Sequence, residues 1–463
     1  MRKLRLALMP MLLSRDQSSV RDIFQRYMLP LGPFYLANYL QSLNLPLEII
    51  IHDDPDVVEF FNPDIIGFSC VSENFGYAIA VAESLKKSTG ALTVLGGPHI
   101  TCMPDYLPEG FDLAVIGEGE VALREIVENY LQHAEKISQW SKIQGLLYRE
   151  NGELIQNGRS QTIVELDALP ILHRKKWASH IGVPHIMTTR GCVYNCFFCA
   201  EPTLFKGFRQ NSPERIVQEI ELLIQEYPHI QHLRFYDDIF PVNKKRLRRI
   251  AELFEERKLN QRLSFSCFIH AKLVDEEVAQ LLKKMNFIFV QFGAETGSAT
   301  LLKELKPESQ INLNQKAIDL FYSQGIHVGL TLILGTPNET ESDLKQTLQF
   351  LKINNKKIID AEVNPAVCLP GTQLFKHAQE KNLLPPNDKM DWAFFQDKGH
   401  LKLFDPEKYI YLAEQIDPEI FYDHLKKIWL FNDEIRTINN TDSFMKNNYM
   451  AGFMPVSFET RWH

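Results

Sequence analysis

The chain has 463 residues, of which 45% are hydrophobic and 23% charged, and its formal net charge is −8. This length predicts about three domains, with enough apolar residues for ordinary cores. An acidic chain lacks the electrostatic footprint of a nucleic-acid-binding protein, and its two basic clusters, 173–176 and 244–249, are expected to be solvated surface.

The apolar run at residues 6–13 imitates a signal peptide. Pro10 interrupts it, however, and no small-x-small cleavage site follows, so a first buried strand explains it better. No later stretch offers the roughly 18 uninterrupted apolar residues of a membrane span. We therefore expect a cytoplasmic protein without a membrane span, in a compartment where thiols stay reduced.

Residues 1–135 alternate short apolar runs with helical patterns, which predicts an open parallel sheet with helices on its faces. Glycine-rich turns at 96–99 and 117–120 follow two of the expected strands. In such sheets ligands bind beyond the carboxyl ends of the strands, where glycine lets the backbone approach closely. The strands are predicted at 4–9, 47–52, 65–69, 92–95 and 113–116, and helices at 34–40 and 77–85.

Residues 136–184 are predicted to be a connector. Strand-like segments at 143–149 and 153–155 flank Asn151-Gly152, a strong signal for a hairpin turn.

Three of the seven cysteines, Cys192, Cys196 and Cys199, lie within eight residues, after a strand-like segment that begins at His185. Thiolates are soft ligands for zinc or iron–sulfur clusters. A structural zinc site needs four ligands, usually as two separated pairs, and the other four cysteines each stand alone. A cluster with one open iron is therefore favoured over zinc, chance or a disulfide.

Strands and helices alternate again over residues 185–375, which predicts a partial (β/α) barrel of six repeats with catalytic groups at the carboxyl ends of its strands. The strands are expected at 186–189, 233–236, 263–269, 288–292, 328–334 and 361–368. Their ends carry the cysteine loop, Asp237-Asp238, His270, Glu295, Gly335 to Glu339 and Pro370 to Thr372. Each of these has an ordinary explanation as a cap or turn, and only as a set do they indicate an active site.

Residues 376–463 are predicted to be helical in places. Their aromatic residues could cover the open side of the incomplete barrel, because an aromatic tail more often packs than recognises a ligand. These residues are Trp392, Phe394, Phe395 and Trp429.

The spacing C-x3-C-x2-C, with Phe198 before the last cysteine, resembles the radical S-adenosylmethionine (radical SAM) superfamily. The resemblance implies that Cys192, Cys196 and Cys199 hold a 4Fe-4S cluster, whose fourth iron binds the amino and carboxylate groups of S-adenosylmethionine. It also implies that Phe198 contacts adenine, that Glu295 holds the ribose or amino group, and that the Gly335 segment packs on the adenine edge. We expect Asp237 to be a weaker polar contact near the substrate.

Four further blocks, at 31–37, 63–69, 95–99 and 115–120, resemble in their order the amino-terminal cobalamin-binding domain of one large radical SAM class. Blocks at 235–238, 292–298, 333–340 and 369–372 resemble the same class. The likeness implies that the cobalamin nucleotide tail and corrin edge are lined by Ser69, Ser72, Gly96, Gly97 and Gly117. No Asp-x-His-x-x-Gly stretch supplies a cobalt ligand, and we do not expect His52 or His99 to be one.

The expected fold is thus α/β: a Rossmann-like cobalamin-binding domain, a partial (β/α)6 TIM-like radical SAM barrel and a small helical carboxyl-terminal region. By resemblance the chain is a cobalamin-dependent radical SAM methyltransferase acting on an unactivated carbon or phosphorus of a small metabolite or natural product. An electron donor such as flavodoxin or ferredoxin would reduce the cluster. The 5'-deoxyadenosyl radical would abstract hydrogen, and cobalamin would supply the methyl group.

Other functions remain open. The same domains could serve a radical SAM cyclase, oxidase or rearrangement enzyme, with cobalamin non-methylating or absent. A non-catalytic corrin-binding protein is a further alternative. An RNA methylthiotransferase would require additional amino-terminal cysteines and a basic terminal domain, and neither is visible in the sequence.

Overall fold

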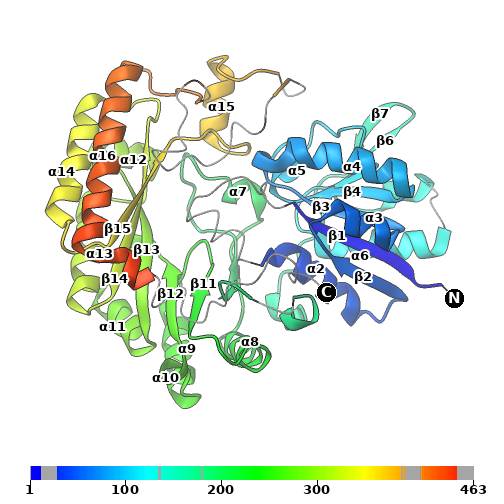
Figure 1. Cartoon of the computed structure of the whole chain (residues 1–463), viewed down its shortest axis with the longest axis horizontal. Helices are drawn as coiled ribbons and strands as arrows, with labels where there is room; N and C mark the ends of the chain where they lie inside the picture. Colours follow the sequence, from blue (N-terminus) through cyan, green and yellow to red (C-terminus); the bar gives the residue numbers. More distant parts are fainter. Residues whose placement is uncertain are drawn as a thin grey trace.

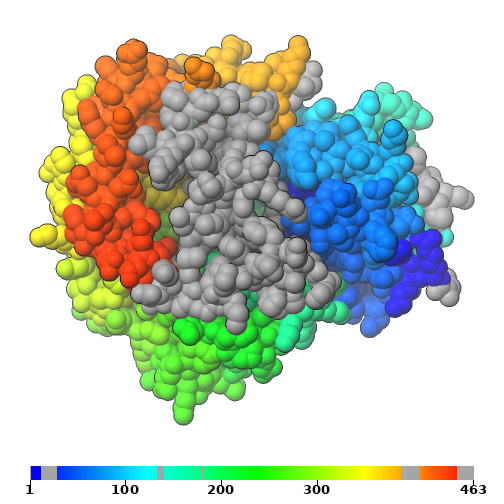
Figure 2. Space-filling model, viewed as in Figure 1, coloured from blue at the N-terminus to red at the C-terminus, as the bar shows by residue number. Residues whose placement is uncertain are grey.

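The computed structural model describes residues 2–11, 29–133, 137–178, 181–386, 389–390, 392, 407 and 409–445. These residues form two α/β units side by side, a first domain and a barrel domain (Figure 1). Figure 2 shows the first domain in blue beside the barrel in green to red. Among the described helices, none is long and apolar enough to cross a membrane.

The first domain is built on a seven-stranded sheet in the order β2-β1-β3-β4-β5-β6-β7. The five predicted strands are confirmed and pair in parallel. The order 2-1-3-4-5 is that of a flavodoxin-like doubly wound sheet, whose ligands bind near the β1/β3 switch point. The strands are β1 Leu4–Pro10, β2 Leu47–Ile51, β3 Ile65–Ser69, β4 Leu92–Gly96, β5 Leu113–Val115, β6 Leu146–Glu150 and β7 Glu153–Gln156.

Alternation along the strands builds a core on each face of this sheet. In β1, Ala7 and Met9 join the core under α3, α4 and α5, whereas Leu6 and Leu8 join the core under α2 and α6. The helices are α2 Leu31–Ser42, α3 Pro55–Phe61, α4 Phe75–Thr89, α5 Pro98–Cys102 and α6 Gly119–His133. The two predicted helices are therefore confirmed as α2 and α4.

The hairpin predicted at Asn151-Gly152 is also confirmed, with both residues at positive φ. Its strands do not stand apart as a connector, however. β6 pairs antiparallel with β5, so the hairpin extends the first sheet. The segment that connects the two domains is therefore shorter than predicted and begins after β7. Its described residues contain only two short 3-10 turns, η3 Leu166–Ala168 and η4 Arg174–Lys176.

The barrel domain contains six parallel strands in the order β15-β14-β13-β12-β11-β8, which confirms the predicted partial barrel. The strands are β8 His185–Ile186, β11 His232–Phe235, β12 Ser264–Phe268, β13 Phe287–Glu295, β14 His327–Leu334 and β15 Asp360–Pro365. The surrounding helices are α8 Pro213–Glu226, α9 Lys244–Glu256, α10 Leu259–Arg262, α11 Glu276–Lys284, α12 Ala299–Leu305, α13 Ile311–Ser323, α14 Glu341–Asn354 and α15 Gln373–Glu380. Lys244, Arg248 and Arg249 of the basic cluster on α9 form exposed ion pairs, as expected of solvated surface. Arg246 in the same cluster and Arg174 in the other one are buried, so the expectation is wrong for these two arginines.

The carboxyl-terminal region contributes α16 Pro418–Ile438 and α17 Thr441–Phe444. Trp429 of α16 is buried, and its indole N–H donates to the Val363 carbonyl of β15 at 2.8 Å, so it is a packing residue of the barrel. Trp392 instead packs edge-on against Phe75 and His99 of the first domain. The same core also contains Leu374 and Phe375 of α15, so the expectation that Trp392 covers the barrel stays a prediction. Phe394 and Phe395 lie outside the described residues.

Candidate active site

The cysteine loop lies at the carboxyl end of the first barrel strand. It runs from β9 Thr189–Arg190 to the short helix α7 Glu201–Leu204, which lies between the two sheets (Figure 1). Gly191 opens the loop at φ +81°, and a Cβ there would lie 2.4 Å from the Gly207 carbonyl oxygen. Only glycine allows this approach between β9 and β10 Arg209–Gln210.

The backbone of Phe197 fixes the middle of the loop. Its N–H donates to the Leu305 carbonyl at 2.9 Å, and its carbonyl accepts from the Leu374 N–H at 3.2 Å. The end of α12 and the start of α15 therefore both hold the loop, one through the N–H group of Phe197 and the other through its carbonyl group. The cysteines on either side of it gain a defined position without any metal.

The three thiols fit a cluster better than a single metal ion. All are half-buried and free, and burial raises the pKa of Cys196 to about 11 and of Cys199 to about 12. Among the described residues, no three His, Cys, Asp or Glu side chains are grouped to share one ion. A 4Fe-4S cluster does not require such convergence, because each thiolate binds a different iron.

Phe198 is partly buried and, like Ile333 and Leu369, packs against an apolar core that includes Leu374. Its predicted contact with adenine stays a prediction, and the apolar surroundings suit a flat aromatic ligand.

Glu295 ends strand β13 with a buried side chain and a positive φ of 60°. Its Oε1 accepts from the Lys306 ammonium at 3.1 Å, and the same ammonium donates to the Gly293 carbonyl at 2.8 Å. Its Oε2 is buried and has no hydrogen-bond partner among the described residues. Because a buried carboxylate oxygen needs a donor, Oε2 fits the role of acceptor for a ligand amino or hydroxyl group.

A second buried carboxyl shapes the Gly335 turn at the end of β14. Glu339 Oε2 accepts from the backbone N–H groups of Gly335 and Thr336. Burial raises the pKa of Glu339 to about 8. Within the described part of the chain, Glu339 Oε1 and Thr336 Oγ1 have no partner, so polar atoms remain free at this strand end too.

The structure corrects the role expected of Asp237. Its side chain is fully buried, and it accepts hydrogen bonds from the Thr189 N–H at 2.8 Å and the Thr188 hydroxyl at 2.6 Å. Asp237 therefore does not face a substrate. Instead it holds the segment that leads into the cysteine loop, which Arg246 also holds by donating to the Thr188 carbonyl at 3.0 Å.

This placement predicts a pH dependence of stability. Burial raises the pKa of Asp237 to about 6, although its bonds to Thr188 oppose the shift. The folded state thus keeps a proton that the unfolded state loses near pH 4, so stability falls as pH rises from about 4 to 6, by about 2–3 kcal/mol. Asp237→Asn keeps the shape and an acceptor oxygen for the backbone N–H groups without titrating, although its amide nitrogen cannot accept from the Thr188 hydroxyl. Glu201 and Glu339 titrate in both proteins, so the test is the difference between the two. Urea unfolding should show that the wild type loses about 2–3 kcal/mol relative to the variant across this range. Parallel profiles would contradict the prediction.

Sequence reasoning missed one pair beside the cluster loop. The Glu201 and Asp238 carboxyl groups lie close enough to interact, and burial followed by the charge of Asp238 raises the pKa of Glu201 to about 8. Two carboxyl groups in such contact share a proton near neutral pH. The sequence could have indicated this pair, because Glu201 lies two residues after Cys199 and Asp238 lies at the end of a predicted strand.

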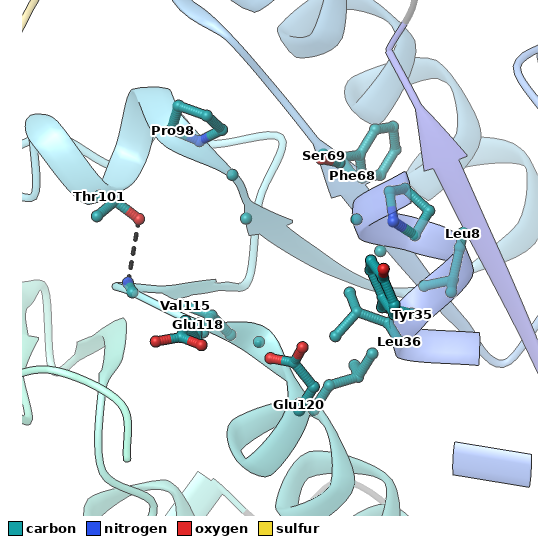
Figure 3. A pocket seen from close by; sticks show the side chains of 18 of the residues that line it. Leu8, Tyr35, Leu36, Phe68, Ser69, Pro98, Thr101, Val115, Glu118 and Glu120 are labelled. Atoms are coloured by element: carbon teal, nitrogen blue, oxygen red, sulfur yellow. Dashed lines mark hydrogen bonds between the residues drawn. The ribbon is translucent and has the colours of Figure 1, made fainter. Parts of the chain in front are cut away.

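A cavity of about 250 Å³ lies at the carboxyl edge of the first sheet (Figure 3). Four of the five predicted cobalamin contacts line it: Ser69, Gly96, Gly97 and Gly117. Gly97 has φ +97°, and a Cβ there would lie 2.6 Å from the Cys70 carbonyl oxygen. The position at the switch point and the largely apolar lining fit a nucleotide-sized group.

The fifth predicted contact, Ser72, does not line this cavity. Its hydroxyl lies 3.0 Å from His99 Nδ1, and the His99 ring stacks on Phe75 at 3.8 Å between centroids. Burial lowers the pKa of His99 to about 3, so the ring is neutral. A contact of Ser72 with the corrin edge stays a prediction. His52 does not line the cavity either, and its Nδ1 accepts from the Asp54 N–H at 3.0 Å.

The comparisons with known proteins agree with both halves of this site. The radical SAM superfamily model matches residues 186–351, and the B12 binding domain model matches residues 23–127. The chain is 30% identical over 399 residues to an uncharacterized methyltransferase of Pyrococcus horikoshii, which covers 81% of this chain and 83% of that protein. It is also 25% identical over 373 residues to the anaerobic magnesium-protoporphyrin IX monomethyl ester cyclase of Rubrivivax gelatinosus, covering 77% of this chain and 62% of the cyclase.

Among solved structures, the radical SAM methyltransferase TsrM of Kitasatospora setae, with cobalamin and a 4Fe-4S cluster bound, has a similar fold. Its TM-score is 0.71 at 16% identity, over 99% of this chain and 92% of that chain. The chain therefore belongs to the radical SAM superfamily, and it carries a B12-binding domain ahead of its radical SAM domain.

Proposed function

We propose that the protein is a cobalamin-dependent radical SAM methyltransferase that modifies an unactivated carbon or phosphorus of a small molecule. The observation that carries the proposal is the shared wall between the two halves of the site. Arg190, two residues before Cys192, and Leu204, at the end of the helix after Cys199, both line the cavity of the B12-binding domain. A corrin held there would lie beside the cluster.

In this proposal the chain positions its cofactors and excludes water. Cys192, Cys196 and Cys199 would hold a 4Fe-4S cluster, which when reduced would supply the electron that cleaves S-adenosylmethionine. Glu295 Oε2 would accept a hydrogen bond from the amino group or ribose of that ligand. Lys306 holds the Glu295 carboxylate in position through Oε1. Phe198 and the Gly335 turn pack on the adenine.

The proposed corrin site uses the glycine turns of the first domain. Gly96, Gly97 and Gly117 let the backbone approach the nucleotide tail, with Ser69 as a polar contact. When bound, cobalamin supplies the methyl group. All seven cysteines are free, which suits a cytoplasmic protein reduced by flavodoxin or ferredoxin.

A second candidate is supported by the similarity to the Rubrivivax gelatinosus cyclase. In that case the same two domains would carry out cyclisation, oxidation or rearrangement, and no methyl group would leave S-adenosylmethionine.

The two candidates differ in their products. We expect reduced, anaerobically reconstituted protein to form S-adenosylhomocysteine only when hydroxocobalamin is supplied, because a methyl group must pass from S-adenosylmethionine. Liquid chromatography with mass spectrometry measures S-adenosylhomocysteine and 5'-deoxyadenosine together. Formation of 5'-deoxyadenosine alone, with or without cobalamin, would favour the cyclase-type function over methylation.

A further inference from the structure

A buried charge network joins the first domain to the start of the cysteine loop. Arg190 donates through Nη1 to Glu118 Oε2 and through Nη2 to Glu120 Oε1, both at 2.6 Å. Glu118 Oε1 also accepts from Arg209 Nη2 at 2.5 Å. The four side chains are only 6–12% exposed. Two arginines therefore meet two glutamates in a region from which water is largely excluded.

A second contact holds the other end of the cysteine loop. Arg159, on the segment after β7, donates to the carbonyl groups of Thr203 at 2.6 Å and of Leu204. These residues belong to α7, which begins two residues after Cys199. The first domain thus holds the loop two residues before its first cysteine, and the segment that follows β7 holds it a few residues after its last cysteine.

Both contacts form part of the cavity wall. Glu118, Glu120, Arg190 and Leu204 all line the cavity, and Figure 3 shows both glutamates where the chain enters α6. Tyr35 closes the wall beside them, with Arg190 5.5 Å from its ring centroid. A ligand in the cavity would therefore touch the same side chains that fix the ends of the cysteine loop.

The network resists a movement of residues 117–120 relative to Arg190 at the start of the cysteine loop. The planar guanidinium of Arg190 bridges two carboxylates at once, which demands a definite geometry. A shift of residues 117–120 relative to Arg190 would leave buried charges unpaired, and such charges are strongly destabilising. The glutamate turn and the start of the cysteine loop are therefore expected to move as one body.

We propose that Arg190 is a positioning residue that couples the cavity of the B12-binding domain to the cluster loop, so that a bound corrin holds Cys192 in place. This inference rests on the proposed function. By linkage the coupling is reciprocal: cobalamin slows the loss of the cluster, and the cluster strengthens the binding of cobalamin.

The test measures iron loss in the full-length protein, loaded with cluster and either with or without hydroxocobalamin. After anaerobic incubation with EDTA and desalting, retained iron gives the rate of cluster loss. Hydroxocobalamin should slow this rate about tenfold in the wild type, within the usual range of site-to-site coupling. In Arg190→Gln the rates with and without hydroxocobalamin should be nearly equal. Arg190→Lys, which cannot bridge both glutamates, should give an intermediate ratio.

The matched control is Arg174→Gln. Arg174 is as deeply buried and pairs with Glu219 at 2.7 Å, but it does not line the cavity. A general loss of packing would change the absolute rates in this variant and leave the tenfold ratio intact. If Arg190→Gln fails to fold, Glu120→Gln replaces one of the two ion pairs with a neutral hydrogen bond and should lower the ratio to a few-fold.

The outcomes distinguish a failure of the coupling from a failure of the proposed function. A wild type that binds both cofactors but loses iron at equal rates refutes the coupling alone. A full tenfold ratio in Arg190→Gln or Glu120→Gln does the same. A wild type that binds no hydroxocobalamin overturns the proposed function, and the coupling with it.

Discussion

Cys196→Ala is expected to abolish the visible absorption of the 4Fe-4S cluster in anaerobically reconstituted protein, and with it all cleavage of S-adenosylmethionine. Cys196 lies beside Phe197, whose backbone is bonded to two barrel segments. Among the described residues, no three His, Cys, Asp or Glu side chains are grouped to form an alternative metal site. With two thiolates left, the cluster loses one of its three protein ligands.

Cys267→Ala is the matched control for this result. Cys267 is a buried core thiol of strand β12, away from the loop, so its removal should cost about 1 kcal/mol of stability and leave the spectrum intact. Ultraviolet–visible spectra and iron content of both variants provide the comparison. An unchanged spectrum in Cys196→Ala would remove the assignment of the loop as the cluster site.

Glu295→Gln is expected to weaken the binding of S-adenosylmethionine by tenfold or more while the cluster remains. The substitution keeps the shape of the side chain but removes its charge, and a hydrogen bond to a charged group contributes about 1.5–3 kcal/mol. Glu295 Oε2 is the buried acceptor that lacks a partner among the described residues. Lys306 would also be left buried without its carboxylate.

Glu219→Gln controls for the loss of a buried carboxylate. Glu219 of helix α8 pairs with buried Arg174 and is not among the residues proposed to bind S-adenosylmethionine, so this variant should lose stability without losing affinity for the ligand. Equilibrium dialysis with labelled S-adenosylmethionine measures the affinity, and iron content reports the cluster. Equal affinities in Glu295→Gln and the wild type would exclude Glu295 from the binding site.

Periodicity predicted the fold well because both sheets are parallel and buried. Their strands appear as short continuous apolar runs, such as 65–69 and 328–334, and the structure confirms strands at both places. The hairpin was also predicted from Asn151-Gly152, but not its attachment to β5. Edge pairing is a long-range choice that a local turn signal does not specify.

For the site, the sequence predicted which residues lie at the strand ends but not where their side chains point. A strand-end rule found the correct edge for Asp237 and Glu295, but it does not say which way each side chain points. Asp237 turned toward Thr188 and Thr189 because their backbone N–H groups, buried at the start of the loop, needed an acceptor. Glu295, in contrast, keeps one carboxylate oxygen that has no hydrogen-bond partner in the described part of the chain.

The interdomain network could not be predicted from spacing. Arg190 is 72 residues from Glu118 and 70 residues from Glu120 in the sequence, and no local pattern marks the pairs. Single charges in glycine-rich turns normally indicate solvated surface. Only the folded arrangement shows that these glutamates are buried against the cysteine loop.

The cobalt and iron content of the purified protein tests the central claim most directly. The protein should be produced in cells supplied with hydroxocobalamin, purified without oxygen and measured by inductively coupled plasma mass spectrometry. We predict about one cobalt and about four irons per chain, as one corrin and one 4Fe-4S cluster require. Four irons with reproducibly no cobalt would contradict a cobalamin-dependent enzyme.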